Sequence, residues 1–161
     1  MDYIYRMNLK EKSEIKRKLN EACTLFVNKR NQTITNIIES NRKALASESK
    51  SSAGDKHETG RAMLQLEIEK ASQQFTSVHQ MQKILNRISS KASIQVIALG
   101  SVVKTTHNNY FISISIGEIS IGDEKYFAIS PKSPIGHLLL GKKKGDEAQF
   151  NSIIFRIVDV F

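Results

Sequence analysis

Two different hydrophobic periods divide the chain. Across residues 9–92, apolar residues recur at steps of three and four, the spacing of one face of an α-helix. From residue 93 onward, apolar residues alternate with polar ones or form short runs rich in β-branched side chains, as strands do. The pattern predicts an α+β protein: a long antiparallel helical coiled-coil hairpin over 1–92, then a small, mostly antiparallel β domain with one short helix over 93–161.

The helical half contains two predicted helices. No Gly or Pro occurs between Leu9 and Ser49, and a second periodic segment follows residue 56. Residues 47–56 between them are small and polar, so the helices must fold back for each apolar stripe to find a partner. About 40 residues at 1.5 Å each give an arm of roughly 60 Å. The stripe positions are Ile15, Leu19, Ala22, Phe26, Ile34, Ile37, Ile38 and Leu45, then Leu64, Ile68, Ala71, Phe75, Val78, Met81, Leu85, Ile88 and Ala92.

Strands and one short helix are predicted in the second half. Ser133 is a favourable helix cap, Pro134 suits the first helical position, and Gly141 ends the segment after three leucines. Turns are expected at residues 108–109 and 122–123. The predicted strands cover residues 94–97, 101–104, 111–116 and 155–160.

The charge is concentrated in the helical half. Residues 1–92 carry 17 Lys or Arg against 10 Asp or Glu, whereas residues 93–161 carry 7 against 6. A basic excess of this kind favours an acidic partner, either nucleic acid or an acidic protein surface. Cys23 is the only cysteine, which excludes a disulfide framework and is typical of a reducing cytoplasm. With no apolar signal or membrane segment, we expect a cytoplasmic protein that does not bind membranes.

The candidate chemistry lies in an acidic tip near residues 51–60. Asp55 and Glu58 stand three residues apart at the predicted start of the second helix, where they could act as a helix-capping pair. The same two carboxylates could also hold Mg²⁺ weakly, if another macromolecule supplies further ligands. His57 has no second His or Cys beside it, so a transition-metal site is not expected. Cys23 falls beside an apolar stripe and is interpreted as a buried core residue, not a nucleophile.

Two motifs resemble a known family. The first is Gly-Asp-x-x-Glu at residues 54–58, and the second is the stretch 130–147, which contains Ser-Pro-Ile and then Leu-Leu-Gly-Lys-Lys-x-Gly-Asp-Glu. The first motif lies at the tip of the predicted helical hairpin, and the second lies in the predicted β domain that follows. In this order they resemble the Gre transcript-cleavage factors of bacteria. The resemblance covers nearly the whole chain, and the second motif is the harder one to meet by chance.

The resemblance implies a partner and a division of labour. The second domain would be FKBP-like and dock on RNA polymerase through Ser133, Pro134 and Ile135, while the coiled coil enters the secondary channel. Asp55 would face a Mg²⁺ ion shared with the polymerase, and Glu58 would help to orient the metal or a water. Nucleic acid would be met only within the elongation complex. The protein would have no cofactor of its own and would act as a monomer.

This chain departs from the usual pattern of the Gre family in two places. Thr59, Gly60 and Arg61 replace the Asn, the small residue and the acid that usually follow the tip motif, and Lys132 replaces an Asp or Asn. The chain has no Trp and shows no sequence sign of an aromatic-lined proline pocket, so prolyl isomerase activity is not expected.

The resulting prediction is a transcription elongation factor, not itself an enzyme, that stimulates transcript cleavage by RNA polymerase. Two alternatives stay open: a secondary-channel regulator that does not cleave, and a basic coiled-coil interaction module.

Overall fold

A computed structural model describes residues 6–48, 54–89 and 95–161, with only the backbone of 54–57. The chain divides into two compact units. The first, called here the sheet unit, comprises Met1–Thr24 and Ile84–Phe161, and the second, the hairpin unit, is Leu25–Lys83. Helix α1 therefore contributes residues to both. In chain order the elements are α1 (Leu9–Glu48), α2 (Gly54–Asn86), β1 (Val102–Thr105), β2 (Asn109–Ile112), β3 (Gly117–Ile121), β4 (Glu124–Ile129), α3 (Pro134–Leu139), β5 (Glu147–Phe150) and β6 (Ile153–Val160).

The two long helices confirm the predicted helical half. A reciprocal cap fixes the start of α1: the Glu11 amide donates to Asn8 Oδ1, and the Asn8 amide donates to Glu11 Oε2, both at 2.9 Å. α1 ends at Glu48 and α2 begins at Gly54, so both helices extend into the segment predicted as a connection. α2 ends at Asn86, which leaves the predicted stripe residue Ile88 beyond the helix; Ala92 lies outside the described residues.

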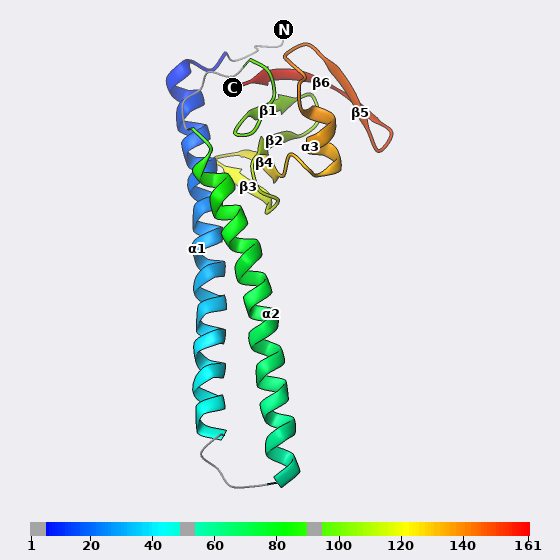
Figure 1. Cartoon of the computed structure of the whole chain (residues 1–161). Helices are drawn as coiled ribbons and strands as arrows, with labels where there is room; N and C mark the ends of the chain where they lie inside the picture. Colours follow the sequence, from blue (N-terminus) through cyan, green and yellow to red (C-terminus); the bar gives the residue numbers. More distant parts are fainter. Residues whose placement is uncertain (1–5, 49–53, 90–94) are drawn as a thin grey trace. The chain divides into compact units, whose positions relative to one another are not determined.

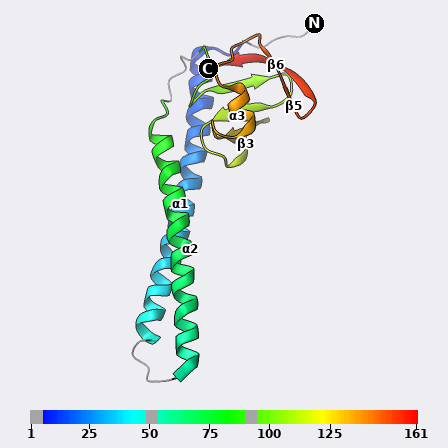
Figure 2. The ribbon, with the colours of Figure 1, turned by 45° about the vertical axis from the view of Figure 1, so that its right-hand side comes forward.

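Within the hairpin unit, α1 and α2 run side by side in opposite directions (Figures 1 and 2). Val27 and Ile34 are buried from α1 and Ala71 and Val78 from α2, each pair seven residues apart, as in a coiled-coil seam. The predicted stripe was too wide, because Phe75 is exposed. A helix with a single partner can bury only a narrow seam, so the edges of a wide apolar stripe stay in solvent. Although long, neither helix is apolar enough in its described residues to span a membrane.

The sheet unit contains a six-stranded mixed sheet in the order β3-β4-β2-β1-β6-β5. All neighbouring strands pair antiparallel except β2 and β4, which are parallel. Two predicted strands are corrected. Of the strand predicted over 94–97, the described residues 95–97 make only an isolated bridge, between Val96 and Lys143, and the strand predicted over 111–116 ends at Ile112. Ile114 is nevertheless buried, so the apolar run there reflects burial and not a longer strand.

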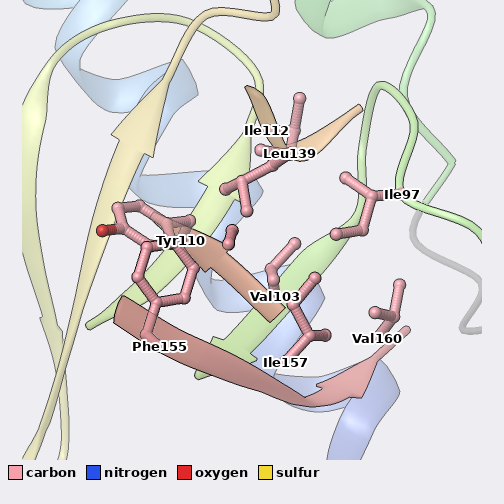
Figure 3. Close-up of a cluster of buried hydrophobic side chains, with 9 residues drawn as sticks. Ile97, Val103, Tyr110, Ile112, Leu139, Phe155, Ile157 and Val160 are labelled. Atoms are coloured by element: carbon pink, nitrogen blue, oxygen red, sulfur yellow. The ribbon is translucent and has the colours of Figure 1, made fainter. Parts of the chain in front are cut away.

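Both faces of this sheet are covered. Val102 and Val103 are adjacent on β1, point to opposite faces, and are each 0% exposed. On one face, Val103 belongs to a core that includes Leu139 of α3 (Figure 3). The other face meets the first turns of α1, where Cys23 Sγ lies 3.7 Å from Ser113 Oγ. Cys23 is buried as predicted, and burial raises the pKa of its thiol, which disfavours the thiolate.

Candidate functional site

The predicted acidic tip coincides with the start of α2. Because α2 begins at Gly54, Asp55 lies in the first helical turn. The capping role weighed for Asp55 and Glu58 stays a prediction, because the side chain of Asp55 lies outside the described residues. Positions 55 and 58 lie on one face of this helix, since residues three apart are neighbours. Carboxylates in a first turn are stabilised as anions by the positive end of the helix dipole.

The described part of the tip contains charges of both signs. Glu58 and Arg61 are exposed, whereas the side chains of Asp55 and His57 lie outside the described residues. A third carboxylate is also present, which the sequence did not suggest: Glu48, the last residue of α1, faces α2, and its Oε1 lies 3.4 Å from where a Cβ on Gly60 would stand. Only the fold-back of the helices brings Glu48 to this position.

Asp55 and Glu58 are the candidate metal ligands of the tip. Among the described side chains, no three His, Cys, Asp or Glu residues gather to hold a metal ion. Mg²⁺ prefers octahedral oxygen ligands and commonly takes one or two carboxylates, with the rest from water or phosphate. Two acids on one helix face would suit that partial role, with Asp55 as the metal-facing residue and Glu58 as its neighbour.

Ser133 has a structural task at the start of α3. Its Oγ accepts a hydrogen bond from the Gly136 amide at 3.1 Å and donates one to the Ser130 carbonyl oxygen at 2.6 Å. Pro134 follows at the first helical position, and Gly141 takes a left-handed conformation with φ +82° just after the helix, both as predicted. The Ser133 hydroxyl is thus occupied by the backbone, so it holds the motif in shape.

Ile135 belongs to an apolar pocket of about 300 Å³ on the sheet unit. This pocket is a correction, because the sequence showed no sign of an aromatic-lined cavity. Its aromatic walls come from four different strands: Tyr110 from β2, Phe127 from β4, Phe150 from β5 and Phe155 from β6. Figure 3 shows the Tyr110 and Phe155 side chains together at one end of the core. The remaining lining residues are His107, Asn108, Ile129, Asn151 and Ile153.

One rim of the pocket is a tight turn. Asn151 and Ser152 connect β5 to β6 with φ values of 50° and 66°. Positive φ at both central residues is the mark of a type I′ hairpin turn, which Asn favours. The turn sets Phe150 opposite Ile153 in the register of the two strands. Ile153 is 42% exposed although it lines the pocket, so the cavity continues into an apolar surface.

The phenol of Tyr110 is a polar group in the pocket wall. Burial raises the pKa of Tyr110, and a hydrogen bond with Asn108 opposes this only in part, so the phenol is neutral near pH 7. The pocket therefore combines mostly apolar walls with a few polar groups, a composition that suits an apolar side chain of another molecule.

No protein-family model and no curated protein matches this chain. The resemblance to Gre factors therefore rests on the two motifs and on the order of the helical and sheet segments.

Proposed function

We propose that this protein binds RNA polymerase, inserts its helical hairpin into the secondary channel and stimulates cleavage of backtracked transcripts. The observation that carries the proposal is the placement of Asp55 and Glu58 on one face at the start of α2, which is separated from the end of α1 by five residues. Acids at this position can reach a site that a long, narrow helical pair can enter.

The chemistry proposed is phosphodiester hydrolysis with a shared metal. When bound between the tip and the polymerase, Mg²⁺ would supply charge stabilisation and an activated water. Asp55 would contribute an oxygen ligand, and Glu58, exposed one helical turn further, would orient the water or the ligand set. Positions 55 and 58 both lie near the N-terminus of α2, where the helix dipole favours a negative charge.

Docking is proposed for the Ser133, Pro134 and Ile135 segment together with the apolar pocket. Pro134 is exposed, and Ile135 lines the cavity. A cavity of about 300 Å³ could receive one or two apolar side chains from the polymerase surface. Such anchors in well-desolvated pockets contribute most of the binding energy in protein interfaces.

The test uses the full-length protein and stalled, backtracked elongation complexes of a bacterial RNA polymerase. We expect the wild-type protein to shorten the transcripts, and Asp55→Asn or Glu58→Gln to slow cleavage by about 10- to 100-fold. Glu69→Gln, which changes another exposed acid further along α2, is the matched control and should cleave normally. Polymerase binding, followed by co-elution on size-exclusion chromatography, should be equal for all four proteins.

Other outcomes separate the alternatives. Binding without cleavage by the wild-type protein would favour a channel regulator that does not cleave. No binding at all would leave the basic coiled-coil interaction module.

A further inference from the structure

A second cavity, of about 260 Å³, lies in the sheet unit and is lined by basic side chains. Arg6 precedes α1, Lys12 lies in its first turns, Lys104 belongs to β1, and Lys144 follows α3. None of these residues lines the apolar pocket. The cavity thus gathers four cations from distant parts of the sequence, in a unit whose segment 93–161 has almost no net charge.

The charge of this cavity is strongly unbalanced. Asp159 is the acidic residue among its lining residues, which leaves a formal excess of three positive charges. Glu124 lies outside the lining but pairs with Lys104, so it removes part of this excess. Cations that face one another around a concave surface focus the electrostatic field and raise the local concentration of anions.

Two of the lysines are held in place by the fold. Lys12 Nζ lies 3.0 Å from Asp159 Oδ2 and 5.4 Å from the centre of the Phe161 ring. Lys104 Nζ lies 2.8 Å from Glu124 Oε2. The side chain of Lys12 is only 22% exposed, and that of Lys104 only 17%. Because these side chains are already ordered, binding a ligand would cost them little further conformational entropy. Arg6 and Lys144, by contrast, are exposed at the cavity.

We propose that this basic cavity binds a phosphate group. Even with Lys104 paired to Glu124, a single carboxylate would neutralise only one of the remaining excess charges, whereas a phosphate offers up to two negative charges and several acceptor oxygens. Arg6 can donate two parallel hydrogen bonds to such a group, and the lysines act as point charges. The phosphate belongs either to a nucleic-acid backbone or to a free polyphosphate compound. The inference goes beyond the proposed function and does not depend on it.

The experiment uses the full-length protein alone, with two probes. A labelled single-stranded oligonucleotide is titrated by fluorescence anisotropy, and inorganic pyrophosphate by calorimetry. We expect Arg6→Ala and Lys144→Ala each to weaken binding by about tenfold. Lys143→Ala is the matched control, because it removes the same charge from the neighbouring exposed residue outside the cavity, and should change affinity less than about twofold.

The salt dependence gives an independent readout. For a single-stranded oligonucleotide, each lost phosphate contact should reduce the slope of log K against log salt by about 0.7. If Arg6→Ala and Lys144→Ala weaken binding of the oligonucleotide alone, the ligand is a backbone phosphate. If they weaken binding of pyrophosphate alone, the ligand is a free polyphosphate. Both results support the proposal. It would be overturned if Lys143→Ala weakened binding as much as Lys144→Ala, if neither probe bound at low salt, or if only a poly-glutamate peptide depended on these residues.

Discussion

Gly136 approaches Ser130 so closely that a Cβ on Gly136 would stand 2.1 Å from the Ser130 carbonyl oxygen. The same carbonyl accepts the hydroxyl of Ser133, whose oxygen in turn accepts the Gly136 amide. The Ser-Pro-Ile-Gly segment is therefore held by its own backbone contacts, and only glycine fits at its fourth position. This geometry presents Pro134 and Ile135 in a fixed arrangement beside the apolar pocket.

Gly136→Ala should destabilise the protein by about 1–3 kcal/mol, because a methyl group cannot be accommodated without moving the Ser130 carbonyl. Urea denaturation of the full-length protein, followed by circular dichroism, measures the change in the free energy of unfolding. His137→Ala alters the next, exposed residue of α3 and should stay within about 0.5 kcal/mol of the wild type. Equal stability of Gly136→Ala and the wild type would mean that the close approach relaxes freely.

Ile153 and Ile154 provide a test of the docking pocket, since they are neighbours on β6 that point to opposite faces. Ile153 lines the pocket, whereas Ile154 does not and is 68% exposed. Ile153→Ser should weaken binding to RNA polymerase by about tenfold or more, and Ile154→Ser by less than about twofold. A competition assay against labelled wild-type protein measures both. Equal effects of the two variants would argue against the pocket as the docking site.

The helical half was predictable because its signals are local. Asn8 and Glu11 form a cap within four residues, and the spacing of Ala71, Val78 and Leu85 follows directly from the helical period. The helix ends were less predictable. Residue 88 continues the period of the apolar stripe, yet α2 ends at Asn86, because Ile88 packs within the sheet unit, 3.1 Å from where a Cβ on Gly100 would stand.

The sheet unit was predicted only in outline, because its decisive contacts join distant residues. The parallel pairing of β2 with β4 brings Tyr110 beside Phe127, and the pairing of β5 with β6 adds Phe150 and Phe155 to the same cavity. No local pattern marks these aromatic residues as one group. The domain boundary predicted after residue 92 stays a prediction, although Cys23 of α1 packs with Ser113 in the sheet unit.

Tyr126 should make stability depend on alkaline pH. Its buried hydroxyl donates to Glu124 Oε2 at 2.6 Å, and burial, with the nearby carboxylate, raises the pKa of the phenol far above its ordinary value of 10. The folded state thus favours the protonated phenol, so this stabilisation is present below pH 10 and is lost as the pH rises further. Tyr126→Phe removes both the hydrogen bond and the titration.

We expect Tyr126→Phe to cost about 1 kcal/mol at neutral pH. The gap between the free energies of unfolding of the wild type and the variant should then narrow from about pH 9 to about pH 11. Chemical denaturation across this range measures both proteins under identical conditions. If the free energies of unfolding of the two proteins changed in parallel with pH, the Tyr126 proton would not contribute to the pH dependence of stability.

Arg61 places a positive charge one helical turn beyond Glu58, on the same edge of α2. Both side chains are exposed, so a pair between them would contribute only a few tenths of a kcal/mol and would leave Glu58 available. The charge of Arg61 nevertheless opposes an incoming divalent cation through Coulomb repulsion. If the tip recruits Mg²⁺ as proposed, reversing this charge should help recruitment.

Arg61→Glu should therefore lower the Mg²⁺ concentration that gives half-maximal stimulated cleavage of backtracked complexes. The measurement is a Mg²⁺ titration of the cleavage rate with saturating amounts of each protein, so that differences in polymerase binding do not contribute. Lys70→Glu makes the same charge change at an exposed position nine residues further along α2 and should leave the midpoint unchanged, because the distance and the screening by salt weaken its field. An unchanged or higher midpoint for Arg61→Glu would show that residue 61 does not tune the metal, and a matching decrease for Lys70→Glu would assign the effect to the net charge of the helix.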